Sequence, residues 1–176
     1  MKHVIALPYV LFALASSAQA QRNEILAPNI ASLQVIANND WMSLPVITLD
    51  NGEYVTIGFD ELSHVVHRYC YKIEHCEADW TTSEELFESD FVNGFATGNT
   101  IDDAEQSINT NTLYTHYAFT LPNDKCAPRL SGNYRVTVYD ENNDSQPVLT
   151  ACFMIVEPGM KVGLSVTSNT DIDINH

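Results

Sequence analysis

One short run of the sequence combines several side chains that could do chemistry. Residues 71–80 read YKIEHCEADW, so a histidine, a cysteine, three acids and a tryptophan stand almost together. Histidine and cysteine are zinc ligands, and a histidine beside a carboxylate can act as a general base. A metal site and a hydrolytic site are the two chemistries to weigh, and the element that carries the run decides between them.

The run continues a segment, Arg68 to Glu74, that has the alternation typical of a β-strand. Alternation places Tyr69, Tyr71, Ile73 and His75 on an apolar face that belongs inward, and Cys70 and Cys76 on the other face. Because His75 and Cys76 then point to opposite sides of the strand, they cannot bind one ion together. The strand therefore argues against a metal site here.

Wider constellations are no more specific. His64, His67 and Cys70 stand three apart, a spacing that suits a helix or a loop rather than a strand. Asp140, Asn142 and Asp144 imitate the first ligands of a calcium loop, but its central glycine and final glutamate are missing. No nucleophile elbow, phosphate-binding loop or zinc-protease motif occurs. The sequence predicts no catalytic residue, no metal and no cofactor.

Seven segments rich in β-branched and aromatic residues alternate with turn residues, and they span residues 33–36, 44–49, 54–59, 68–74, 114–121, 134–139 and 148–156. Asp50-Asn51-Gly52 separates the second from the third and is a strong hairpin signal. This pattern predicts an all-β fold, an immunoglobulin-like antiparallel β-sandwich.

The two termini suggest processing and a longer protein. Lys2, an apolar run too short to span a bilayer and the Ala18-Gln19-Ala20 ending predict a signal peptide at residues 1–20. The sandwich is expected over residues 21–158. Residues 159–176 begin another strand, Val162 to Val166, and are expected to be the truncated start of a following domain.

The formal net charge is −15, and no lysine or arginine occurs between Lys72 and Lys125. Such a field repels phosphate backbones and anionic lipids, so we expect no nucleic acid partner and no direct membrane insertion. Many of the acidic residues lie in a stretch with several phenylalanines, Thr81 to Asn111, that is too long for a plain connection. Its candidate partner interface comprises Glu84, Glu85, Phe87, Glu88, Asp90, Phe91 and Phe95. The alternative is that the phenylalanines only pin the stretch to its own sandwich.

Four cysteines occur in a chain that is expected to be exported, where disulfides are permitted. Cys70 and Cys76 are six strand residues apart, roughly 20 Å, which is too far for a bond. In an immunoglobulin order, the strand that ends at Cys76 and the connection that holds Cys126 lie at the same end of the molecule. The predicted disulfide is Cys76–Cys126, with free buried thiols as the alternative.

The quoted run, as Tyr71-x-Ile73-x-His75-Cys76-x-Ala78-Asp79-Trp80, resembles a signature of the type IX secretion system plug protein family, in its N-terminal domain. The resemblance continues in order over the mature chain, through Gly94-Phe95, residues 111–117 (NTLYTHY), 121–123 (LPN), 130–134 (LSGNY), 138–139 (VY), 147–150 (PVLT) and 168–171 (SNTD). It identifies a structural motif that includes His75, Cys76, Asp79, Trp80, Tyr114, His116 and Tyr134. His75 and Trp80 are then expected to pack the corner where the strand leaves the sheet.

The resemblance implies a non-enzymatic, periplasmic role. Members of this family are similar to a gate that occludes the large outer-membrane translocon barrel while no cargo passes, so the implied partner is that barrel and no small-molecule substrate is expected. The rival class is an exported carbohydrate-binding module or an accessory domain of a hydrolase, because sandwich domains serve those roles too.

Overall fold

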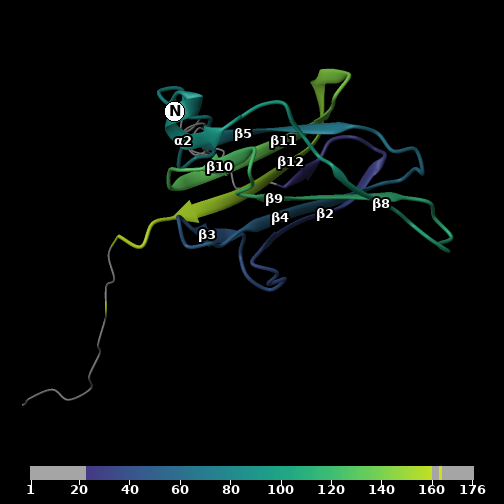
Figure 1. Ribbon diagram of the computed structural model, residues 1–176, viewed down its shortest axis with the longest axis horizontal. Coiled ribbons are helices and arrows are strands. Elements are labelled where there is room, and N and C mark those ends of the chain that lie inside the picture. The colour runs from purple at the N-terminus through teal and green to yellow at the C-terminus, as the bar shows by residue number, and fades with distance from the viewer. Residues whose placement is uncertain (1–22, 160–162, 164–176) are drawn as a thin grey trace, which may run out of the picture.

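Two β-sheets make up most of the molecule, which is described here by a computed structural model for residues 23–159 and residue 163 (Figure 1). The first sheet has the order β1-β12-β11-β5-β7, and β3 also pairs with β12. Its strands are β1 (Glu24–Ile25), β3 (Val46–Thr48), β5 (Tyr69–Cys76), β7 (Asn99–Thr100), β11 (Gly132–Asp140) and β12 (Asn143–Val156). The second sheet has the order β2-β4-β9-β8, with β2 (Ile30–Ala37), β4 (Val55–Glu61), β8 (Asp103–Gln106) and β9 (Thr115–Leu121).

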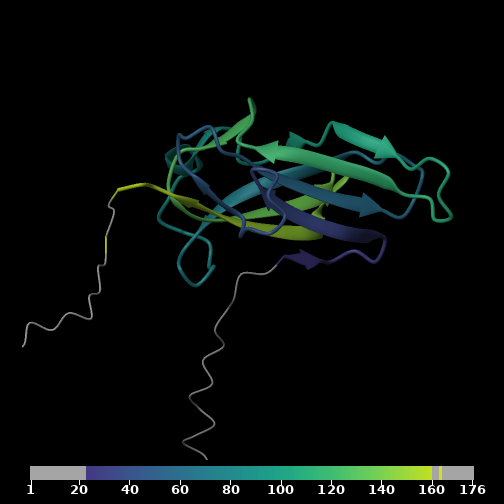
Figure 2. The ribbon, with the colours of Figure 1, turned by 90° about the horizontal axis from the view of Figure 1, so that it is seen from below.

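The strand order matches the fold expected from the sequence. When these seven strands are lettered A to G along the chain, the sheet order β2-β4-β9-β8 becomes ABED and the order β5-β11-β12 becomes CFG. These are the two sheets of an immunoglobulin constant-type domain. The end of β12, where the chain leaves the sandwich, lies at one end of the molecule, and the turn between β8 and β9 lies at the other (Figures 1 and 2). The prediction of an all-β sandwich is confirmed.

The core fills the space between the two sheets. Alternate residues of the central strands are almost fully buried there, among them Phe59, Tyr71, Tyr117, Tyr134 and Phe153. Aromatic rings also stack across the core, such as Tyr71 of the first sheet on Phe119 of the second, with centroids 4.4 Å apart. Burying such large apolar surfaces is the main force that holds the sheets together. The predicted inward face of β5 is borne out for Tyr69, Tyr71 and Ile73, which are all core residues.

All seven predicted strands exist, but one predicted connection is wrong. The residues Asp50-Asn51-Gly52 do not join a hairpin, because β3 belongs to the first sheet and β4 to the second. Asp50 and Gly52 do have the positive φ angles of a tight turn, 55° and 71°. The turn therefore carries the chain between layers, and β3 pairs in parallel with the end of β12 rather than antiparallel.

The long stretch between β5 and β9 is an excursion along the edge of the sandwich. It contains α2 (Glu88–Phe91), β6 (Val92–Gly94), β7 and β8, so it adds an edge strand to each sheet. β6 pairs with β10 (Cys126–Pro128) in a separate two-stranded sheet. The expected signal peptide and following domain lie outside the described residues, apart from residues 159 and 163.

Candidate functional site

His75 lies at the end of β5 and is held on both ring nitrogens. Nδ1 is 2.8 Å from the Ser83 hydroxyl, which in turn donates to Glu77, and Nε2 is 3.2 Å from the Ser131 carbonyl oxygen. The ring packs edge-on against Tyr134, with centroids 5.3 Å apart. Both nitrogens are thus engaged by the chain itself, which is what a packing role at the corner requires.

Gly132 explains why the chain can pass so close to this ring. A Cβ atom at position 132 would lie 2.2 Å from His75 Nε2, and the φ angle of 144° is one that L side chains rarely adopt. The glycine at the start of β11 therefore lets the backbone approach the imidazole. The 130–134 segment of the family resemblance and the histidine of the quoted run form one packed unit.

The rest of the quoted run forms a turn beyond β5. Asp79 accepts hydrogen bonds from the backbone and the hydroxyl of Thr81, and these bonds lower the pKa of its carboxyl group. Trp80 has a positive φ of 67° and is half-buried. Its carbonyl oxygen accepts a hydrogen bond from Arg135 at 3.4 Å. The turn holds Trp80 by its backbone.

The histidines and cysteines of the wider constellation do not converge. His64 bonds to Ser107, whereas His67 bonds to Glu61. Within the part of the chain that the structure describes, no group of three or more metal-ligating side chains comes together. The chemistry that their spacing suggested therefore has no geometric basis among these residues.

The predicted Cys76–Cys126 disulfide is absent, and both residues are buried free cysteines. Cys126 belongs to the core between the sheets, close to the Tyr71 hydroxyl, and burial raises the pKa of its thiol to about 12. Cys76 lies on the opposite face of β5, as strand alternation requires. The two thiols are separated by the strand, although both lie towards the same end of the molecule.

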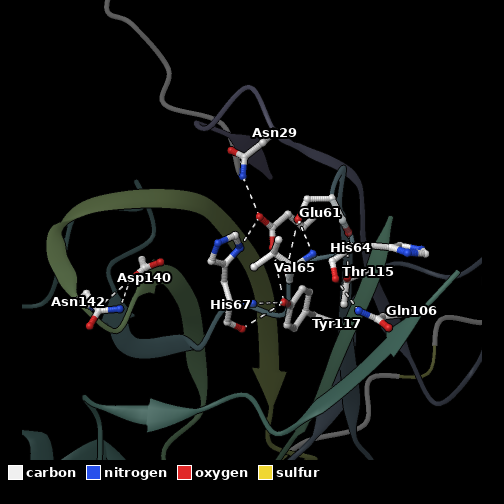
Figure 3. A network of polar contacts seen from close by, with 11 residues as sticks. Asn29, Glu61, His64, Val65, His67, Gln106, Thr115, Tyr117, Asp140 and Asn142 are labelled. Atoms are coloured by element: carbon white, nitrogen blue, oxygen red, sulfur yellow. Dashed lines mark hydrogen bonds and ion pairs between the residues drawn. The ribbon is translucent and has the colours of Figure 1, made fainter. Parts of the chain in front are cut away.

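A buried carboxylate stands at the end of β4, where no sequence pattern indicated one. Glu61 has a side chain only 2% exposed, and its Oε1 lies 2.6 Å from Nδ1 of His67, a side chain that is 42% exposed. Asn29 donates a further hydrogen bond to the same oxygen at 3.3 Å. Figure 3 shows these side chains converging from three segments of the chain. Buried charges in proteins require partners of this kind.

Tyr117 completes the network around Glu61. Its hydroxyl accepts from the His67 backbone N–H at 2.9 Å and lies 3.1 Å from the His67 carbonyl oxygen (Figure 3). Burial, and then the charge of Glu61, raise the pKa of the neighbouring Tyr69. The contacts of His67 tie the connection of residues 62–68 to the sandwich, and Asn29 ties the segment before β2 to the end of β4, so the arrangement supports a structural function. The only sequence signal was an acid and a histidine six residues apart.

His116 of the family motif lies on β9 of the second sheet and Tyr114 lies just before this strand, whereas His75 is on the first sheet. His116 Nδ1 is 2.7 Å from Asp60, and the ring covers Gly58, where a Cβ would be 3.4 Å from the ring. Both motif residues line a shallow depression of about 310 Å³ together with Ser32, Gln34 and Glu105. Tyr134, in contrast, is fully buried in the core. The motif residues thus serve separate places in the fold.

The candidate partner interface divides into buried and exposed residues. Phe91, in α2, is 6% exposed and packs near His75 and Tyr134, so its place in the interface is corrected to the core. Phe87 and Phe95 are 78% and 71% exposed. Four acids of the same stretch are also exposed: Glu84, Glu85, Glu88 and Asp90. We call Phe87, Phe95 and these acids the acidic–aromatic surface.

Comparison with known families decides the relationship. The family described as "Type 9 secretion system plug protein 1st domain" matches residues 30–157. The chain belongs to this family. The matched range begins at β2 and ends just after β12, so it covers every strand of the sandwich except β1 and includes both His75 and Glu61.

A solved structure supports the same fold for this plug-protein domain. The chain is similar to a crystal structure of a hypothetical protein from Parabacteroides merdae, with 41% identity and a TM-score of 0.75 over 78% of this chain. The match spans about a third (34%) of that longer chain. No curated protein matches the sequence. Among the described residues, no helix is long and apolar enough to span a membrane.

Proposed function

We propose that this chain is the first domain of a periplasmic plug that occludes the outer-membrane translocon of the type 9 secretion system. The family match over residues 30–157, from β2 to the end of β12, is the observation that carries the proposal. We propose a non-enzymatic role, because the polar side chains around His75 and around Glu61 make their hydrogen bonds to other residues of this chain. The partner is a large barrel protein of the outer membrane, and export depends on the signal peptide expected at residues 1–20.

Within this role, the acidic–aromatic surface is the region that we assign to partner contact. Two exposed phenylalanines and four exposed acids of the same stretch combine contact area with long-range steering. α2 holds the surface in place, because its Phe91 is buried and the Phe87 N–H donates to Asp90 at 2.9 Å. A loop that only pinned itself to the sandwich would have turned all three rings inward.

The function is tested on the translocon isolated from the same envelope and reconstituted in a bilayer. Adding the full-length protein should lower the ion conductance of the open barrel, and deleting its gene should make cells more permeable to large antibiotics. Unchanged conductance together with unchanged permeability would reject the plug role. A glycan-binding screen run in parallel addresses the rival class, and a specific glycan bound by a protein that ignores the translocon would favour the carbohydrate-binding module.

The interface is tested by removing charge and rings separately. Neutralising Glu84, Glu85, Glu88 and Asp90 with their amides should slow association with the translocon, most at low salt, because screening weakens steering. Replacing Phe87 and Phe95 with serine should speed dissociation. The matched control neutralises four exposed acids elsewhere: Glu24, Asp50, Asp103 and Glu105. Equal binding by the test and control variants at every ionic strength would place the interface outside the acidic–aromatic surface.

A further inference from the structure

The loop between β2 and β3 exposes three large apolar side chains in a row of four residues. Trp41 is 68% exposed, Met42 93% and Leu44 71%. Isolated exposed apolar residues are ordinary, but a contiguous group of this size marks an interaction site. The nine residues from Trp41 to Leu49 carry no charged side chain, in a chain whose net charge is −15. A charge-free stretch suits the core of a lasting interface.

The loop is ordered by hydrogen bonds that leave these side chains pointing outward. Asp40 accepts from the Met42 backbone N–H at 3.0 Å, and Asp40 N–H donates to the Ala37 carbonyl at 2.8 Å. Asn38 exchanges hydrogen bonds with the Tyr54 backbone, at 2.9 and 3.0 Å. Asn38 and Asp40 therefore fix the backbone of the loop by hydrogen bonds, while Trp41, Met42 and Leu44 stay exposed to solvent.

This loop runs directly into the edge where the chain leaves the sandwich. The Pro45 carbonyl accepts from Met154 N–H at 2.9 Å, and Leu49 N–H donates to the Val156 carbonyl at 2.9 Å. β3 therefore lies against the last residues of β12, and Val156 is itself 45% exposed. In Figure 1 the chain leaves beside β3, at the end of β12.

We propose that Trp41, Met42, Leu44 and Val156 form the docking surface for a following domain of the same polypeptide. The solved relative is a longer chain, of which this sandwich matches 34%. A domain that begins close after Val156 reaches this edge through a short linker, which gives it a high effective concentration there. It would present an apolar face, because nothing in the loop between Trp41 and Leu49 can pair with a charge. The proposal does not depend on the plug function.

The test uses the full-length protein encoded by the gene. Trp80→Phe leaves Trp41 as the tryptophan reporter within this domain. The fluorescence of Trp41 is obtained by subtracting the spectrum of a variant that also carries Trp41→Phe. Covered by the following domain, Trp41 should resist acrylamide quenching. The double variant W41S/M42S should be cut by protease at residues 157–159 several-fold faster than the parent. The matched control, F87S/F95S, removes two equally exposed rings elsewhere and should be cut at the parent rate.

Four results would overturn the proposal. Trp41 could be quenched as readily as free tryptophan in the full-length protein, or the gene could end at His176. W41S/M42S could abolish a concentration-dependent dimer, which would make a second copy the occupant. It could also abolish translocon binding while leaving cleavage at the linker unchanged, which would assign the surface to the partner.

Discussion

Two histidine–carboxylate pairs on consecutive residues of β4 allow a controlled comparison between the inside and the outside of the sandwich. Glu61 and His67 are 2.6 Å apart, and Asp60 and His116 are 2.7 Å apart. The two histidine side chains are 42% and 41% exposed, whereas the carboxylates are 2% and 20% exposed. The His–carboxylate distances are therefore almost equal, and the pairs differ in burial of the acid and in the Asn29 and Tyr117 contacts that Glu61 also makes. The comparison shows that a distance alone says little about what an ion pair contributes.

The first prediction breaks each pair by removing its histidine. His67→Phe should lower the free energy of unfolding by about 2–4 kcal/mol at neutral pH, because it leaves a buried carboxylate with only the neutral partners Asn29 and Tyr117. His116→Phe should cost less than about 1 kcal/mol, because water can reach Asp60. Urea unfolding of both variants beside the parent measures the difference. Equal costs for the two variants would contradict the assigned role of burial.

The second prediction applies the same contrast to two glycines that lie under histidine rings. Gly132→Ala should destabilise by about 2–3 kcal/mol, because its Cβ would collide with His75 and the φ of 144° disfavours a side chain. Gly58→Ala should change stability by less than about 1 kcal/mol, since its Cβ would meet His116 at an ordinary 3.4 Å. Thermal melts of both variants provide the measurement. In a His75→Ala background, Gly132→Ala should destabilise less, because the clash with the imidazole is gone. If Gly132→Ala costs as much stability in that background as in the parent, its effect comes from the backbone conformation alone.

Alternation along strands made much of the fold predictable, because it depends only on neighbouring residues. It is enough to place Tyr71 inward and to set His75 and Cys76 on opposite faces of β5. Glu61 could not be found this way, because the sequence pattern ended the strand at Phe59. Its contacts also depend on Asn29 and Tyr117, which come from distant segments, besides His67 six residues further on. The Asp50–Gly52 turn shows the same limit: its conformation is local, but whether it joins one sheet or two is decided by the pairing of β3 with β12.

The third prediction concerns tyrosines on the inside of the sandwich at alkaline pH. Burial and the charge of Glu61 raise the pKa of Tyr69, whereas burial raises the pKa of Tyr134 and no carboxylate contributes. A raised folded-state pKa means that stability is fully present below the unfolded value of about 10 and is lost as pH rises above it. Glu61→Gln should lower the pKa of Tyr69 and leave that of Tyr134 unchanged, as followed by tyrosinate absorbance. Asp60→Asn is the control and should shift neither tyrosine.

The last and smallest effect concerns thiol reactivity, which reports on the two faces of β5 without changing stability. Cys126 lies between the sheets and Cys76 lies on the opposite face, yet burial raises the pKa of both thiols, that of Cys126 to about 12. The thiolate is the reactive form, so both should react with iodoacetamide at pH 8 far more slowly than an ordinary thiol, whose pKa is about 8.5. Urea should make both react at once, which also distinguishes free thiols from the Cys76–Cys126 disulfide that the sequence suggested. Mass spectrometry of tryptic peptides reads the two sites separately.

If Cys76 were alkylated in the native protein while Cys126 stayed protected, the turn of residues 77–83 would have to open in solution. The corner around His75 would then be less rigid than its hydrogen bonds to Ser83 and Ser131 indicate. Protection of both thiols would show that the outer face at this end of β5 is closed as tightly as the core.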